Sequence, residues 1–449
     1  MRPIVARERV ARIVAGLFGL VIAAALVVGV GSERGLEWDF VSYYNGGSRL
    51  YHGEARNLYR PDAPIAGRPA FFSPVFDYVG FPLSAWVFAP LGAFSPVPAL
   101  RVFKLFCAAC AAGGLLLLYR EVLCASDRRW RSATGLALFL GAVAAFGPLW
   151  LIFGVGGQLT ATAFLLLVLS FVALRRERLG ASALCFSGVI LLKPFFLASA
   201  WVFALARDWP WLGRLAIALG VEAALSLALF GLQVHFDWFD LLRQKEGWWA
   251  APWWNDVAPI ALAGDFWYYA AGQALPLEAP PPPLLHTLQW VFKLAALALF
   301  ARLASETRRS ALPAERRREH AFALAALLPL FLPTMAWPHY LVLFLVPLSI
   351  VAARSAARSR GAALLAAALL ISALRPDLWL IFARGPRLRP VESLLEAIGL
   401  SLYGRATLLM ALGALLVRHA RLLRIQELST RNATDGAPSG QAVGVRSDA

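Results

Sequence analysis

Four polar side chains have types and positions suited to chemistry at a membrane surface. Asp39 follows the first long apolar run, Gln158 follows two glycines, Lys193 interrupts an apolar stretch, and His339 lies in a short turn. Ionisable groups at membrane depth are costly and tend to be functional. A carboxylate that takes a proton from an alcohol, beside cations that stabilise a departing phosphate, suffices for group transfer from a phosphate.

The elements that carry these side chains are indicated by composition. Of 449 residues, 59% are hydrophobic and 16% charged, and the mean hydropathy is +0.62. Apolar runs near 20 residues recur from end to end, which is long enough for a helix to cross a bilayer. Because the runs are continuous rather than alternating, we expect an all-α polytopic integral membrane protein and not a barrel.

The net charge of +16 comes from arginines clustered between the apolar runs. This distribution is the positive-inside pattern, so nucleic acid is not the expected partner and anionic lipids are. Arginines before the first run place residues 1–10 in the cytoplasm and Asp39 outside. All four polar groups then lie toward one outward-facing cavity.

The runs predict about twelve helices within residues 11–425. Residues 32–98 form a structured first outer loop, in which residues 78–94 make an interfacial helix because prolines and a short length disfavour a span. A tryptophan-rich outer loop covers residues 232–284, and residues 426–449 form a disordered cytoplasmic tail. The expected spans are residues 11–31, 99–119, 133–153, 158–175, 211–231, 285–304, 320–336, 338–354, 361–380 and 398–418.

Residues 181–206 are too short to cross the membrane twice and lie between two basic loops. A short hairpin broken at Lys193 and Pro194 returns the chain to the cytoplasm. One tilted helix kinked at Pro194 is the alternative, and it would invert every later loop. We favour the hairpin, which places Lys193 at its tip.

Motifs for other chemistries are missing from the sequence. The four cysteines lie in or beside apolar runs without the neighbours that complete a metal site, so we predict no metal and no cofactor. Walker A, His-Glu-x-x-His and Gly-x-Ser-x-Gly patterns do not occur, which leaves ATP-driven transport, zinc proteolysis and serine hydrolysis without support.

Several short motifs together carry a resemblance over residues 10–420. They are Asp39 with the following Tyr43-Tyr44, Leu50-Tyr51-His52-Gly53, Ala89-Pro90-Leu91, Gly157-Gln158, Lys193-Pro194 and His339-Tyr340. In these the chain resembles the GT-C glycosyltransferases and is most similar to glycosyltransferase family 87, the polyprenyl-phosphate-mannose-dependent α-mannosyltransferases. The resemblance implies a GT-C-like bundle that uses a polyprenyl-phosphate sugar donor and a glycolipid or glycan acceptor in the cell membrane.

The resemblance matches Asp39 to the family's catalytic acid, which would act as general base in an inverting transfer to an acceptor hydroxyl. The other candidate residues divide by charge. The expected donor phosphate ligands are Lys193, His339, His52 and Arg49. The expected substrate contacts are Tyr43, Tyr44, Gln158, Trp337, Tyr340 and Asp77.

Alternatives remain open for the residues and for the function. Asp39 also fits a solvated acid at a helix end, and Asp77 is the rival base or a partner of Arg68. Lys193 also fits a lysine whose amine reaches the surface. A transporter or lipid flippase would explain many helices around a polar cavity, but it predicts corresponding helix breaks in two halves, and the sequence shows one strong break.

Overall fold

The computed structural model describes residues 2–33, 39–60, 78–152, 158–244, 283–333, 338–354, 409–410 and 412–420. Every regular element in these ranges is helical, which confirms the all-α prediction. Four helices are long and apolar enough to cross a membrane: α1 (Arg2–Gly31), α3 (Pro96–Leu117, prolonged by the π-helical η4, Leu118–Cys124), α9 (Trp209–Gln244) and α12 (Pro283–Arg309). With five shorter apolar helices beside them, they make a polytopic membrane bundle.

The shorter helices fill the spaces between the long ones. They are α2 (Asp39–Tyr51), α4 (Ala133–Ala145), α5 (Gly147–Leu151), α6 (Thr160–Arg175), α7 (Leu179–Leu192), α8 (Ser199–Leu205), α13 (Ala314–Leu327) and α14 (Leu345–Arg354). Short 3-10 helices are η1 (Ala55–Asn57), η2 (Pro82–Val87), η3 (Ala89–Ala93), η5 (Arg128–Arg131), η7 (Pro194–Ala198), η8 (Leu328–Leu330) and η9 (Pro338–Val342). Expected spans at residues 361–380 and most of 398–418, and the tail, lie outside the described residues.

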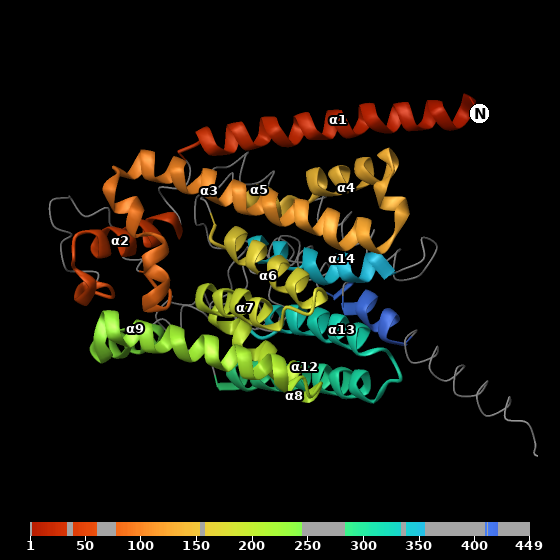
Figure 1. Cartoon of the computed structure of the whole chain (residues 1–449). Helices are drawn as coiled ribbons and strands as arrows, with labels where there is room; N and C mark the ends of the chain where they lie inside the picture. Colours follow the sequence, from red (N-terminus) through yellow and green to blue (C-terminus); the bar gives the residue numbers. More distant parts are fainter. Residues whose placement is uncertain are drawn as a thin grey trace, which may run out of the picture.

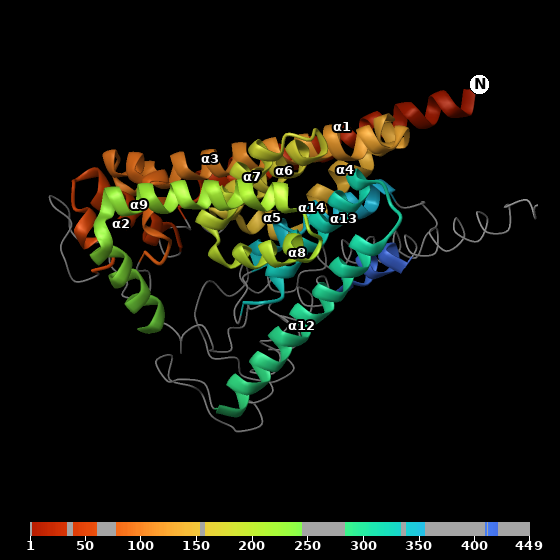
Figure 2. The same cartoon turned by 60° about the horizontal axis from the view of Figure 1, so that its bottom comes forward.

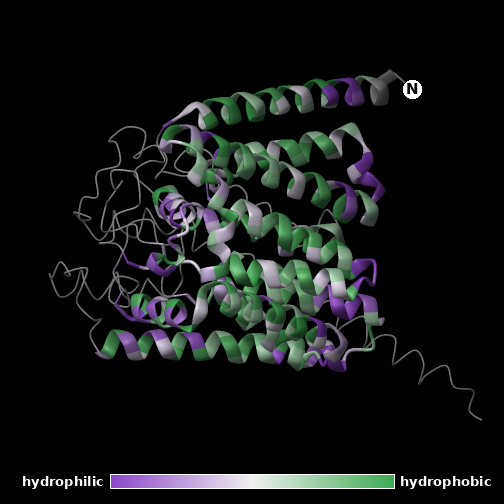
Figure 3. Cartoon of the chain, turned by 60° about the vertical axis from the view of Figure 1, so that its left-hand side comes forward, coloured by the Kyte–Doolittle hydropathy of each residue, from purple (hydrophilic) through white to green (hydrophobic). Residues whose placement is uncertain are grey.

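Helix α6 forms the centre of the bundle, packed between α3 and α7 (Figure 1). Helix α1 lies at the edge along α4 and leaves most of its surface exposed. Apolar residues fill the middle of the helices, and polar residues gather at the end where α1 begins (Figure 3). A band of this kind is what lipid requires, since exposed apolar side chains face hydrocarbon there.

Residues 181–206 form the expected hairpin. Helix α7 ends at Lys193, and the chain returns through η7 and α8. The indole Nε1 of Trp211, at the start of α9, donates to Ser182 Oγ at the start of α7 over 2.9 Å. Because the beginnings of α7 and α9 touch, the chain has turned back at Lys193 and has not crossed as one kinked helix.

Helix α2 packs so closely on the turns that follow it that glycine is required. A Cβ on Gly47 would lie 2.2 Å from the carbonyl oxygen of Phe88, and one on Gly46 would lie 2.8 Å from the ring of Tyr78. Residues 78–94, expected as an interfacial helix, fold as the turns η2 and η3. We call α2 with η2 and η3 the α2 unit, since the three pack together. The α2 unit lies at one end of the bundle (Figure 1).

The predicted span at residues 211–231 ends at a break in α9 at Gly231, and the first residues of the predicted tryptophan-rich loop, up to Gln244, are helical. Gly231 has φ of 73°, a left-handed conformation that glycine adopts without strain. The His235 side chain connects the two segments of α9 by hydrogen bonds. Its Nδ1 lies 2.8 Å from the Gly231 carbonyl oxygen, and its Nε2 lies 2.9 Å from Ser226 Oγ. Since a carbonyl only accepts, Nδ1 donates and the serine hydroxyl donates to Nε2. Figure 2 shows the bent outer arm of α9.

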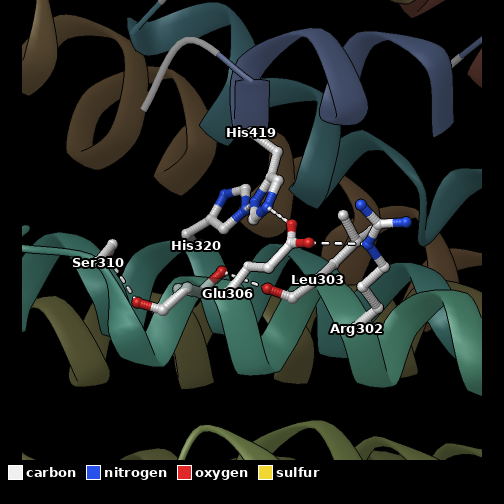
Figure 4. Close-up of polar contacts among 7 residues, drawn as sticks. Arg302, Leu303, Glu306, Ser310, His320 and His419 are labelled. Atoms are coloured by element: carbon white, nitrogen blue, oxygen red, sulfur yellow. Dashed lines mark hydrogen bonds and ion pairs between the residues drawn. The ribbon is translucent and has the colours of Figure 1, made fainter. Parts of the chain in front are cut away.

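A polar cluster with two buried histidines, His320 and His419, joins three helices at the opposite, arginine-rich end. Glu306 on α12 pairs with Arg302 (Oε1 to Nε, 2.8 Å) and with His419 (Oε2 to Nε2, 2.7 Å). His419 Nδ1 lies 3.0 Å from Nε2 of His320 on α13 (Figure 4). We call these four residues the Glu306 cluster. It fastens the helix at residues 412–420 to α12 and α13.

Candidate active site

Asp39 is the first residue of α2 and meets the loop that begins α6. Gln158 Nε2 donates a hydrogen bond to Asp39 Oδ2 over 2.7 Å. The backbone carbonyl of Gln158 accepts from the thiol of Cys107 on α3 over 3.5 Å. Gln158 is 7% exposed, and Asp39 is partly buried. Three elements thus fix the carboxylate at the end of the bundle.

Lys193 brings a positive charge to the same place from the hairpin tip. Its Nζ lies 4.2 Å from the centroid of the Tyr340 ring, within cation–π range. Lys193 also interacts electrostatically with Asp39 and with His339. The Tyr340 ring also contacts the ring of Phe195 on η7, and the two ring centroids lie 5.5 Å apart. The lysine is therefore buried beside an aromatic face and opposite a carboxylate.

The pKa of Asp39 is raised above its ordinary value. Burial is the largest cause, because it disfavours the charged form; the hydrogen bond from Gln158 and the charge of Lys193 act in the opposite direction. A raised pKa brings a carboxylate closer to the range in which it exchanges protons with an alcohol during catalysis. The surroundings therefore suit Asp39 to the role of a base.

Tyr43 lies one helical turn after Asp39, on the same face of α2. Its ring stacks on Phe88 with centroids 4.7 Å apart and planes at 8°. Burial raises the pKa of the Tyr43 phenol, and so do the neighbouring Asp39 and Tyr340. Tyr43 therefore stays a neutral hydroxyl that can donate to or accept from a ligand.

Two buried atoms in this cluster have no hydrogen-bond partner among the described residues: Gln158 Oε1 and His339 Nε2. Both side chains are more than nine-tenths buried. A buried polar atom without a partner costs roughly 1 to 3 kcal/mol. A ligand that offers a hydroxyl to one atom and a phosphate oxygen to the other would recover that cost.

Three other predicted residues lie away from Asp39. Arg49 and His52 lie at the far end of α2 and just past it, about 15 Å along the axis at 1.5 Å per residue. Arg49 donates to the carbonyl of Arg60 over 2.9 Å and pairs with Glu54 at 3.7 Å, and His52 is exposed.

Tyr44 donates to the Phe94 carbonyl. These contacts support the α2 unit. Trp337 and Asp77 lie outside the described residues.

A comparison with protein families identifies the class to which this site belongs. The model of glycosyltransferase family 87 matches residues 78–333, more than half of the chain. The chain belongs to glycosyltransferase family 87. No curated protein matches it. The matched segment of this family 87 chain includes Gln158 and Lys193, whereas Asp39 and His339 flank it.

Family 87 membership makes the protein a membrane glycosyltransferase, with a sugar donor and an acceptor as substrates. Within the described residues, no group of three or more His, Cys, Asp or Glu side chains is placed to hold a metal ion.

Sequence reasoning missed the residues that support this glycosyltransferase site. Phe88 and Phe195 hold Tyr43 and Tyr340 in place, and Cys107 holds the backbone of Gln158. In the sequence, Cys107 is noticeable only as a cysteine in an apolar run without metal-ligand neighbours. Its role was not visible because the partner is a backbone carbonyl 51 positions away.

Proposed function

We propose that this family 87 enzyme transfers a sugar, by default mannose, from a polyprenyl phosphate to a hydroxyl of a lipid or glycan acceptor. The reaction takes place on the extracytoplasmic face with inversion at the anomeric carbon. The single observation that carries the proposal is the meeting of Asp39, Gln158 and Lys193 from three separate parts of the chain.

Asp39 acts as general base in this scheme. It takes the proton of the acceptor hydroxyl while the acceptor oxygen bonds to the anomeric carbon and the bond from that carbon to the phosphate oxygen breaks. The electron pair of the broken bond stays on the polyprenyl phosphate, which needs little acid assistance as a leaving group. Because attack occurs opposite the departing phosphate, a β-linked donor gives an α-linked product.

Lys193 and His339 act on the phosphate. The leaving phosphate gains negative charge in the transition state, and a positioned cation stabilises that state more than the bound substrate. His339 Nε2, which lacks a protein partner in the described part of the chain, donates to a phosphate oxygen when it carries the proton. Tyr43, Gln158 and Tyr340 contact the sugars.

The positively charged end of the bundle supports the assignment of sidedness. Helix α6 begins next to Gln158 and ends at Arg175, which pairs with Glu319 on α13 beside Arg318, so these arginines lie at the end away from Asp39. Arginine-rich ends face the cytoplasm. Asp39 then faces outward, where lipid-linked sugars and not nucleotide sugars are the expected donors.

The experiment that tests this proposal is sugar transfer by purified protein in lipid. A panel of polyprenyl-phosphate sugars is supplied with a mixed glycolipid acceptor pool, and the wild type is compared with Asp39→Asn. We expect one donor to give an α-linked product and the variant to lose at least about 100-fold in kcat, the usual contribution of a general base. Equal turnover by a folded variant would remove Asp39 from the role, and lipid movement without transfer would favour a flippase.

A further inference from the structure

Gln158 contacts the base with one end of its amide and leaves the other end open. The Nε2 atom donates to Asp39 Oδ2 over 2.7 Å, and Oε1 lacks a hydrogen-bond partner in the described ranges. The side chain is 7% exposed, and the Cys107 thiol holds its carbonyl. A buried amide that satisfies one carboxylate oxygen is positioned to determine which way the other oxygen points.

We propose that Gln158 is a positioning residue for Asp39: it holds Oδ2, keeps the carboxylate ionised, and leaves Oδ1 to accept the proton of the acceptor hydroxyl. The inference rests on the proposed function, because it assigns to Asp39 the role of base. A neutral amide suits this task, since it orients a carboxylate without adding a charge that would compete for the phosphate.

Other groups face Asp39, and their effects differ from that of Gln158. Lys193 acts through its charge, with no hydrogen bond that fixes the carboxylate, and Tyr43 lies one turn along the same helix. Behind them are Tyr340 and His339 from η9, and the Cys107 thiol from α3. The amide of Gln158 provides a directional contact, so removing it changes both the geometry and the proton affinity of Asp39.

Two substitutions isolate the amide. Gln158→Leu keeps most of the volume and removes the donor. Gln158→Glu keeps the shape but places two carboxyl groups together, and such a pair shares one proton so that one of them is harder to ionise. The matched control is Thr162→Val in the first turn of α6, four positions after Gln158, because Thr162 donates to Cys110 Sγ over 3.7 Å and makes no contact with Asp39 that the structure gives.

The first measurement is the pH profile of transfer for the three variants and the wild type. For Gln158→Leu we expect the acid limb of kcat to move up by about one pH unit and neutral-pH kcat to fall about tenfold. Gln158→Glu moves the limb further in the same direction, and Thr162→Val leaves it in place. A Gln158→Leu profile that superimposes on the wild type overturns the inference.

The second measurement does not depend on turnover. Infrared difference spectroscopy, wild type minus Asp39→Asn, follows protonation of the Asp39 carboxyl directly as pH changes. The midpoint rises in Gln158→Leu if the amide stabilises the ionised form, and an unmoved midpoint overturns the inference even in an active enzyme. If no donor is turned over but the midpoint rises, the proposed function fails and the coupling between Gln158 and Asp39 stands.

Discussion

Two polar clusters lie at opposite ends of this bundle, and their carboxylates are hydrogen-bonded by protein side chains to different extents. In the Glu306 cluster both carboxylate oxygens are bonded, one to Arg302 and one to His419, and His419 bonds onward to His320 (Figure 4). Around Asp39, the protein contributes one amide donor and a nearby lysine, while Gln158 Oε1 and His339 Nε2 have no partner in the described part of the chain.

The Glu306 cluster has the hydrogen bonds expected of a group that stabilises the fold, whereas the Asp39 cluster has those expected of a group that binds a substrate. A carboxylate that already has an arginine and a histidine gains little from a ligand, and removing its partners would cost stability. A buried site with unpaired atoms is less stable without its ligand than with it. Each cluster also contains a buried atom without a partner among the described residues, His320 Nδ1 in the Glu306 cluster. The two clusters are therefore distinguished by how fully protein side chains bond their carboxylates.

The largest effect that would sharpen this comparison comes from Lys193→Met. We expect kcat/KM for the donor to fall about 100-fold, because a positioned charge at a developing anion contributes on that scale. The matched control is Lys293→Met, which also removes a lysine from an aromatic ring, that of Trp290 at 4.9 Å. A similar loss of transfer in both variants would contradict the assignment.

The pH dependence gives the next largest effect. Burial raises the pKa of Asp39, and only the ionised carboxylate can act as a base, so transfer should rise with pH and level off above that raised value. Below the midpoint, kcat should fall about tenfold per pH unit, as for a single titrating group. The acid limb should vanish from the residual activity of Asp39→Asn. A limb that persists unchanged in that variant would assign the titration to another group.

The stability of the two clusters should respond in opposite ways. Because the folded-state pKa of Asp39 is raised, its ionised form destabilises the folded protein at pH values above both the folded and unfolded pKa, and Asp39→Asn should unfold at the same or a slightly higher temperature. Thermal unfolding in detergent at neutral pH measures this. A clear drop in unfolding temperature would show that Asp39 serves the fold.

The smallest expected effect on transfer comes from His419→Leu. This change removes the partner of Glu306 Oε2 at 2.7 Å and of His320 Nε2 at 3.0 Å, while Glu306 Oε1 keeps Arg302, so the free energy of unfolding should fall by roughly 1 to 3 kcal/mol. Turnover per folded molecule should stay within about twofold. Unfolding curves and transfer measured on the same preparation test both values, and lost turnover with full stability would show that the two ends are coupled.

Much of the architecture was predictable because it follows from local composition. Continuous apolar runs identified the long helices, and the basic loops on both sides of residues 181–206 led to the hairpin with Lys193 at its tip. The same runs could not reveal that α9 extends beyond Gly231. The extension depends on the hydrogen bond from His235 to the Gly231 carbonyl, which hydropathy does not report.

Helix α2 was expected only as a folded loop, for a physical reason. Its centre is Asn45-Gly46-Gly47, and glycine is among the weakest helix formers. The packing of Gly47 against Phe88 and of Gly46 against Tyr78 overrides that preference, and no local pattern encodes such contacts.

Part of the candidate site is recognisable in the sequence. Asp39, Gln158, Lys193 and His339 were recognisable because polar groups are rare in apolar runs, but the bond between Gln158 and Asp39 joins positions 119 apart. The Glu306 cluster was missed because His320 and His419 are separated by 99 positions and each resembles an ordinary loop residue. Arg49 was assigned to the phosphate from proximity in sequence, and the length of α2 carries it away.

The most direct test of the central claim compares Asp39→Asn with Glu306→Gln in the same transfer assay. Each variant neutralises one carboxylate, at opposite ends of the bundle, with almost no change in size. We predict that Asp39→Asn loses at least about 100-fold in kcat and keeps its unfolding temperature, whereas Glu306→Gln keeps its turnover and unfolds at a lower temperature. Full turnover by Asp39→Asn with lost turnover by Glu306→Gln would contradict the account and move the chemistry to the other end.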